Sequence, residues 1–295
     1  MNPIGASTWI WSSPLNDDLL REHGRRLAKW GFDLIELPLE TLDDWSVEAA
    51  LDVQSETGLG ACVCIVMPRD RDLIRDDPAI VASTHDYLRS SIDIAAAVGS
   101  GVVAGPMYSS VGRTWRLDAD ERARLLDRLT EALIPLAEHA AAAGVRLAIE
   151  PLNRFETSLF NTAEQALELI RRVDSPACGL LLDTFHMNIE ERDPAAAIIA
   201  AGDHLAHFHA CANDRGAPGD DHLDWGALVT ALRKVDYTGA VCIESFTSGN
   251  EVIATAASVW RPLAAAQDDI ATRGLEFLKS AMDDRAGPTG GARRG

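Results

Sequence analysis

The chain has 295 residues, of which 47% are hydrophobic and 24% charged, so it has enough apolar material for a large core. Its 27 Lys and Arg against 45 Asp and Glu give a formal net charge of −18 at pH 7. A surface this acidic repels phosphate backbones and anionic membranes, which argues against a nucleic-acid partner and favours a neutral substrate.

The sequence shows no targeting or membrane segment. The first residues, MNPIG, do not form a basic segment followed by an apolar one, so we expect no signal peptide. No apolar run approaches the roughly 20 residues that cross a bilayer. The five cysteines are odd in number and irregular in spacing, as in proteins that keep their thiols reduced. We therefore expect a cytoplasmic protein with no membrane partner. We assign Cys62 and Cys64 to core packing, with a place in the wall of a pocket as the alternative.

Short, nearly continuous apolar segments alternate along the chain with longer amphipathic ones. Buried parallel strands produce the first pattern and crossover helices the second. The expected strands are 4–7, 34–37, 61–66, 102–105, 145–150, 179–183, 205–209 and 240–244. The expected helices are 16–30, 46–58, 78–98, 118–143, 162–173, 193–201, 225–235 and 255–281.

Eight strand–helix repeats in one unbroken register predict an α/β protein with a single (β/α)8 TIM barrel. No GxGxxG turn follows the first strand, which argues against an open dinucleotide-binding sheet. Asp118 and the Thr162-x-x-Gln165 pattern mark the starts of two helices. We expect the catalytic barrel to span 1–283. The remaining residues, 284–295, are rich in Gly and Arg without apolar periodicity, and we expect a flexible C-terminal tail.

The fifth to eighth expected strands each end in a carboxylate or an imidazole. These residues are Glu150, Asp183, His209 and Glu244, which are 33, 26 and 35 residues apart. Because the carboxyl ends of barrel strands meet at one mouth, we expect the four side chains to converge there. Any one of them could be an ordinary polar residue at a strand end, but three converging acids would raise their own pKa values unless a cation lies among them. This donor set suits Mn²⁺, Co²⁺, Mg²⁺ or Zn²⁺.

Polar loop residues follow these strand ends. Glu156 and His186 lie just beyond Glu150 and Asp183, and Arg215 lies six residues beyond His209. A loop Arg or His is often only a surface residue, but the planar guanidinium of Arg215 also offers paired donors to oxygen atoms.

Aromatic residues follow two other strands. Trp9 and Trp11 come after the first strand, and Tyr108 and Trp115 after the fourth. Stacking of Trp11, Tyr108 and Trp115 on sugar carbons is the functional interpretation, and packing at the barrel mouth is the alternative.

Several motifs resemble the ketose 3-epimerases, the group of D-tagatose, D-allulose (D-psicose) and L-ribulose 3-epimerases within the xylose isomerase-like TIM barrel superfamily. The similar stretches include IEPLNRFE at 149–156, LDTFHMNIEE at 182–191, HFH at 207–209 and ESF at 244–246. The similarity runs from Gly5 to about Met282, and the DTFHMNIEE run is specific to this group.

The resemblance implies a metal-dependent epimerase that interconverts C3 epimers of free ketoses, as in D-fructose/D-allulose, D-tagatose/D-sorbose and L-ribulose/L-xylulose. One divalent ion, usually Mn²⁺ or Co²⁺, stabilises a cis-enediolate, and two glutamates on opposite faces of C3 move the proton. It also implies a homodimer or homotetramer. The matching positions are Glu150, Asp183, His209 and Glu244 for the metal, Glu150 and Glu244 for proton transfer, and Glu156, His186 and Arg215 for the O1–O3 end of the sugar.

Two segments depart from the family pattern. Ala212 stands where relatives commonly carry a glutamate, and the 105–115 segment differs from the best-known members. We expect both to affect substrate choice near the O4–O6 end of the sugar.

Three other functions are open to a chain of this kind. One is a different isomerase, epimerase or dehydratase acting on another keto-sugar or an inosose. A DNA-repair endonuclease of the same superfamily is disfavoured by the net charge of −18 and by the lack of extra histidines for a three-metal cluster. A non-catalytic sugar-binding protein would tolerate loss of one glutamate, yet both are present.

Overall fold

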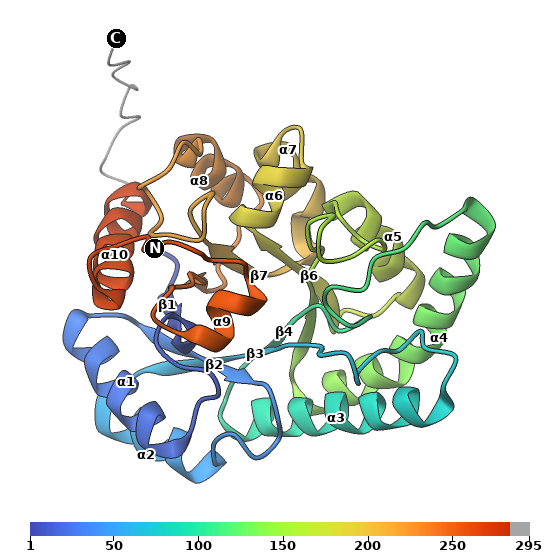
Figure 1. Ribbon diagram of the computed structural model, residues 1–295, viewed down its shortest axis with the longest axis horizontal. Helices are drawn as coiled ribbons and strands as arrows, with labels where there is room; N and C mark the ends of the chain where they lie inside the picture. The colour runs from blue at the N-terminus through green and yellow to red at the C-terminus, as the bar shows by residue number, and fades with distance from the viewer. Residues whose placement is uncertain (284–295) are drawn as a thin grey trace.

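The computed structural model describes residues 1–283, which form a closed barrel of eight parallel strands surrounded by helices (Figure 1). Each strand pairs with its neighbours in the sequence, and β1 (Ile4–Ser7) closes the barrel against β8 (Val241–Ile243). The predicted fold class is confirmed. The predicted flexible tail, 284–295, lies outside the described residues.

All eight expected strands are present, with ends that differ from expectation by at most two residues. The six between β1 and β8 are β2 (Leu34–Leu39), β3 (Gly60–Ile65), β4 (Val102–Gly105), β5 (Arg146–Ile149), β6 (Cys178–Asp183) and β7 (Leu205–Ala210). The outer helices are α1 (Asp17–Trp30), α2 (Val47–Thr57), α3 (Pro78–Ala97), α4 (Ala119–Ala143), α5 (Ala163–Val173), α7 (Pro194–Ala201), α8 (Trp225–Lys234) and α10 (Gln267–Met282).

Polar side chains fix several helix starts. The Asp118 carboxylate accepts a hydrogen bond from the Glu121 N–H at the start of α4. Thr162 and Gln165 form the expected capping box at α5, in which each side chain accepts from the other residue's backbone N–H. These contacts satisfy N–H groups that a helix leaves unbonded in its first turn.

The prediction of one helix over 255–281 is wrong. The structure has a short helix α9 (Glu251–Ala256), a connecting segment, and then α10. Pro262 lies in this segment, where a proline ring prevents helix continuation, and Ser258 adopts a left-handed backbone with φ of 56°. A short helix that the sequence did not predict, α6 (Thr184–Glu190), begins directly after β6, with Asp183 as its N-cap.

Two groups of apolar side chains hold the barrel. The larger packs the strands against the outer helices, and the smaller fills the barrel interior with compact residues, including Cys62, Ala104, Ala148 and Cys242. All five cysteines are buried and free. The prediction that Cys62 and Cys64 pack in the core is confirmed, although Cys64 also lines the cavity described below.

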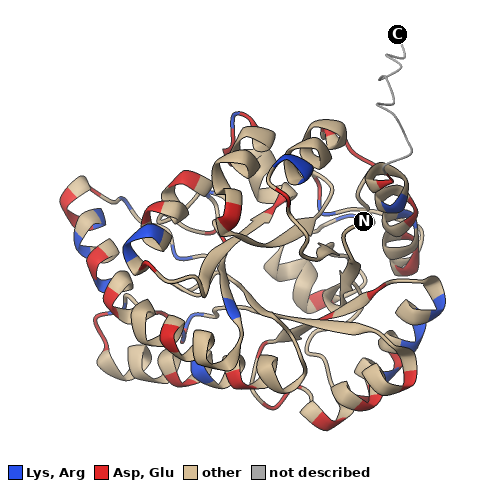
Figure 2. Ribbon diagram, turned by 180° about the vertical axis from the view of Figure 1, so that it is seen from behind, with Lys and Arg blue, Asp and Glu red and all other residues tan. Residues whose placement is uncertain are grey.

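Acidic residues lie mostly on the outer helices and loops, with Lys and Arg residues among them (Figure 2). Many of the basic residues form ion pairs with acidic ones, such as Arg25 with Glu56 and Arg172 with Asp127. No helix within residues 1–283 is both long and apolar enough to cross a membrane.

Candidate active site

The four strand-end residues that the sequence singled out converge at the carboxyl end of the barrel. Glu150 directly follows β5, Asp183 ends β6, His209 lies near the end of β7 and Glu244 directly follows β8. One potential ligand atom from each lies within 4.8 Å of the others, and all four side chains are buried. The barrel therefore brings together residues that are up to 94 positions apart in the sequence.

Two atoms of this cluster have no hydrogen-bond partner although they are buried. These are Glu150 Oε1 and His209 Nδ1, which lies 3.5 Å from Glu244 Oε2. Buried polar atoms without a hydrogen-bond partner are costly. Three carboxylates and one imidazole are donors that a divalent cation accepts, so the residues present fit such an ion.

The acids of the cluster perturb one another's pKa values. Burial, and then the charge of Glu244, raise the pKa of Glu150 well above its usual range. Burial also raises the pKa of Asp183, to about 6, against the opposing effect of Arg215. For Glu244 the effect of burial is outweighed by His209 and Arg215, which lower its pKa. The two glutamates thus lie in environments that push their pKa values apart.

Arg215 supplies positive charge next to the acids. Its Nη1 donates to Asp183 Oδ2 at 2.5 Å and to Glu244 Oε2 at 3.1 Å. The guanidinium lies between the rings of Phe185 and Phe246, at 4.0 and 4.6 Å from their centroids. Its backbone is left-handed, with φ of 71°. The side chain is therefore held firmly beside the carboxylates.

His186 and Glu156 are tied to one loop residue, Asn153. The Asn153 N–H donates to His186 Nδ1 at 3.0 Å, and its side-chain amide donates to Glu156 Oε1 at 2.7 Å. Burial, and then Arg215, lower the pKa of His186 well below its usual value, so the ring is neutral. Its Nε2 lies 3.7 Å from both Glu150 and Asp183 and 3.1 Å from Arg215 Nη2, which can only donate a hydrogen bond. Donors therefore face both ring nitrogens, and the His186 ring links Arg215 to the loop that carries Asn153.

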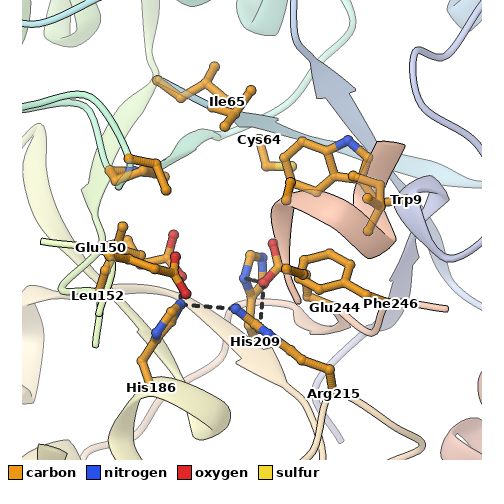
Figure 3. A pocket seen from close by; sticks show the side chains of 18 residues that line it. Trp9, Cys64, Ile65, Glu150, Leu152, His186, His209, Arg215, Glu244 and Phe246 are labelled. Carbon is orange, nitrogen blue, oxygen red and sulfur yellow. Dashed lines mark hydrogen bonds and ion pairs between the residues drawn. The ribbon is translucent and has the colours of Figure 1, made fainter. Parts of the chain in front are cut away.

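These residues line one cavity with two chemically different sides. Glu150, His186, His209, Arg215 and Glu244 gather on one side, and Trp9, Cys64 and Ile65 face them from the other (Figure 3). The rest of the wall is largely apolar: Val66, Gly105, Pro106, Val111, Leu152, Phe246, Ile253, Ala256 and Ala257, with Glu156 as a further polar residue. Gly105 has φ of 138°, and a Cβ there would lie 2.4 Å from the Ile65 carbonyl oxygen, so the β4 end requires glycine.

The structure does not bring three of the predicted substrate contacts into this cavity. Trp11 stacks on His23, and its indole N–H donates to Asp268. Tyr108 is fully buried and packs edge-to-face on Phe160. Trp115 is half-buried and donates to Glu121. Each ring has structural partners elsewhere, so packing describes all three better than substrate stacking.

Of the two departures from the family pattern, only one reaches the cavity. Ala212 is completely buried and does not line the cavity. Of the 105–115 segment, Gly105, Pro106 and Val111 do line it. A contribution to substrate choice is therefore supported for this segment and not for Ala212.

Sequence reasoning missed several residues of the site. Glu36 lies beneath the acidic cluster and contacts His209, and Ile253 of the unexpected helix α9 and Phe246 line the cavity. Glu36 belongs to the apolar stretch GFDLIEL, and a buried acid inside a strand was the signal that could have revealed it.

An eight-stranded barrel with an acidic cluster at the carboxyl ends of its strands is the architecture of a TIM-barrel enzyme. The sequence matches the xylose isomerase-like TIM barrel family over residues 25–281. It is 35% identical to a probable ketose 3-epimerase of Synechocystis sp., across 94% of this chain and 95% of that one. It is 33% identical to an L-ribulose 3-epimerase of Methylomonas sp., across 93% and 96%.

A solved structure gives the same result. The crystal structure of a D-allulose 3-epimerase from Methylomonas sp. in complex with D-allulose matches with a TM-score of 0.87 and 32% identity, covering 94% of this chain and 96% of that one. The chain belongs to the ketose 3-epimerases of the xylose isomerase-like TIM barrel family.

Proposed function

We propose that this protein is a ketose 3-epimerase that binds one divalent cation on Glu150, Asp183, His209 and Glu244. The observation that carries the proposal is the cluster itself: four buried residues with potential ligand atoms within 4.8 Å of one another, among which Glu150 Oε1 and His209 Nδ1 have no hydrogen-bond partner. Family membership supports the reaction type.

The reaction needs a proton acceptor and a proton donor on opposite faces of one carbon. Glu150 and Glu244 come from β5 and β8, on different sides of the barrel mouth, and both face the cavity (Figure 3). One carboxylate removes the C3 proton and the other delivers a proton to the opposite face, which inverts the carbon. A bound divalent cation acts as a Lewis acid that stabilises negative charge on the neighbouring oxygens.

The remaining polar residues orient the reacting end of the sugar. His186 offers a ring nitrogen, Glu156 offers carboxylate oxygens, and Arg215 offers guanidinium donors, and all three line the same cavity. Their grouping on the side of the acids supports a role in holding O1 to O3.

The substrate class follows from the charge of the cavity wall. Arg215 is the single Lys or Arg among the described residues that line it, and its Nη1 is already engaged by two acids. A phosphate group would need more positive charge than this. We therefore propose a free ketose of five or six carbons, with its distal carbons against the apolar side.

Three finer points remain proposals. Mn²⁺ or Co²⁺ is the expected ion, with Mg²⁺ and Zn²⁺ as alternatives that the donor set also accommodates. A homodimer or homotetramer is expected from the resemblance to the family. The cytoplasmic location depends on reduced thiols, and it is supported by five cysteines that are all buried and free.

The test is incubation of the purified protein with Mn²⁺ and D-fructose, D-tagatose or L-ribulose, followed by chromatographic separation of the C3 epimers. We expect a C3 epimer from at least one ketose and none from the Glu244→Gln variant. If every ketose is left unchanged or isomerised to an aldose, another reaction of the superfamily is correct instead.

A further inference from the structure

A fourth carboxylate lies directly beneath the acidic cluster. Glu36, in the middle of β2, points into the barrel and is completely buried. Its Oε2 lies 2.7 Å from His207 Nε2 and 3.0 Å from His209 Nε2, and its Oε1 has no hydrogen-bond partner. It does not line the cavity, so it does not touch substrate.

The contacts of Glu36 determine which nitrogen of His209 is free. An ionised carboxylate only accepts hydrogen bonds, so Nε2 of both rings must carry a proton and donate it to Oε2. His209 Nδ1 then faces the acidic cluster, where it has no hydrogen-bond partner. The two rings meet edge to face, at 4.9 Å between centroids and 81° between planes.

Burial of an acid at this place has a cost that apolar packing would avoid. The interior around Glu36 is lined by compact apolar residues such as Leu34, Cys62 and Cys242. Two ring nitrogens converge on the same carboxylate oxygen, Oε2, an arrangement that stabilises the ionised form of the acid. A buried negative charge beside a cation site is compensated when the cation binds.

Two thiols also lie near His207. Cys62 and Cys242 have sulfur atoms within 4.8 Å of a ring nitrogen of His207. The carboxylate of Glu36 is much closer, at 2.7 Å from Nε2. Glu36 is thus the hydrogen-bond partner of His207.

We propose that Glu36 is a positioning residue for the cation, acting through His209. It fixes the protonated nitrogen and the orientation of that ring, so that Nδ1 is presented to the ion, while His207 holds the Glu36 carboxylate in place. A carboxylate that accepts the second N–H of a metal-bound histidine commonly strengthens metal binding by about 10–100-fold. The inference depends on the cation site of the proposed function.

The test compares Mn²⁺ dissociation constants, measured by calorimetric titration of the metal-stripped protein. Glu36→Gln keeps the volume of the side chain, and its amide oxygen can still accept from both rings at the place of Oε2, but the negative charge is lost. We expect Kd to rise by about 10–100-fold. We also expect the visible absorption spectrum of the Co²⁺-loaded protein to change, because His209 becomes a less basic ligand when its carboxylate partner is lost.

Asp72→Asn is the matched control. Asp72 is also fully buried, accepts from Ser110 Oγ and pairs with Arg113, but it lies outside the cluster. We expect this variant to lose thermal stability while its Mn²⁺ Kd and Co²⁺ spectrum stay at wild-type values.

The outcomes separate the two proposals. If the wild-type protein binds no Mn²⁺, the cation site of the proposed function is wrong, and this inference with it. If the wild-type protein binds Mn²⁺ and Glu36→Gln binds it equally well with an unchanged Co²⁺ spectrum, only the role of Glu36 is refuted. If Glu36→Gln does not fold, His207→Leu, which frees Glu36 without removing it, must still weaken Mn²⁺ binding. An unchanged Kd in that variant also refutes the inference.

Discussion

Arg215 Nη1 lies 2.5 Å from Asp183 Oδ2, a contact between two buried side chains at the centre of the acidic cluster. The same nitrogen is 3.1 Å from Glu244 Oε2. The guanidinium therefore provides the positive charge nearest to two of the proposed metal ligands. It limits the repulsion among the acids when no cation is bound.

This contact predicts the behaviour of Arg215→Gln. Removing one partner of a buried ion pair leaves an uncompensated charge, which costs about 3–5 kcal/mol. We expect metal-free Arg215→Gln to lose about that much unfolding free energy in urea. Added Mn²⁺ should raise the melting temperature more in the variant than in the wild-type protein, because the ion then replaces the missing charge. A metal-free variant as stable as the wild-type protein would contradict this role.

The two-base mechanism predicts a specific pattern for Glu150→Gln and Glu244→Gln. Each should lower the epimerisation rate by about 10²–10⁴-fold, the usual contribution of general acid–base catalysis. In D₂O, the variant that keeps the base facing the C3 proton should still exchange that proton for deuterium without forming the epimer. The other variant should do so when the opposite epimer is the substrate. Nuclear magnetic resonance of the recovered sugar measures both.

Glu121→Gln is a control for these variants, since Glu121 binds Trp115 outside the cavity. It should epimerise at the wild-type rate. Rapid epimerisation by either Gln variant would show that one carboxylate serves both faces, and the two-base assignment would be withdrawn.

Removal of the metal should abolish activity and reduce stability together. After treatment with a chelator, we expect no epimer, and we expect Mn²⁺ or Co²⁺ to restore the reaction. A ligand at 100 times its Kd stabilises the folded state by about 2.7 kcal/mol. The apparent metal affinity should fall as the pH is lowered. The charges of Glu36 and Glu244 raise the pKa of metal-free His209 although the ring is buried. The ion must therefore displace a proton from His209 when it binds. Full activity in a thoroughly stripped protein would rule out the metal role.

The barrel and the acidic cluster were predictable because both depend on regular spacing. Strand ends recur once per strand–helix unit, and a closed barrel brings the ends of β5 to β8 to one mouth whatever their loops do. Glu150, Asp183, His209 and Glu244 could therefore be placed together without coordinates. The connecting segment around Pro262 was not foreseen, because the amphipathic pattern on both sides of it suggested one helix.

The aromatic contacts could not be predicted, because their positions depend on side-chain packing rather than on spacing. Trp11 follows β1 closely enough to reach the cavity, yet its ring turns toward His23 and Asp268. Glu36, by contrast, was not expected at the site and yet contacts it. Its strand looked like ordinary core, and only the fold brings it beneath His209, which is 173 residues away in the sequence.

The packing of His23 against Trp11 gives a prediction about stability. His23 is only 3% exposed, its Nε2 lies 3.1 Å from Ser12 Oγ, and Arg26 Nη1 lies 3.4 Å from its Nδ1. Burial, and then the charge of Arg26, lower its pKa to about 4. Between pH 6.5 and pH 4 the unfolded chain therefore binds a proton at this residue that the folded protein does not, so the contribution of His23 is complete above pH 6.5 and is lost as the pH falls toward 4.

The size of this loss can be isolated by comparing the wild-type protein with His23→Gln. A pKa difference from 6.5 to about 4 corresponds to about 3 kcal/mol of unfolding free energy. Other groups that titrate in this range, such as Asp183, are the same in both proteins, so their effects cancel in the difference. Urea unfolding at pH 7 and pH 4 should show the wild-type protein losing about 3 kcal/mol more than the variant. Equal losses of unfolding free energy in the two proteins would mean that His23 accepts its proton in the folded state. Its contacts with Ser12 and Arg26 oppose that outcome.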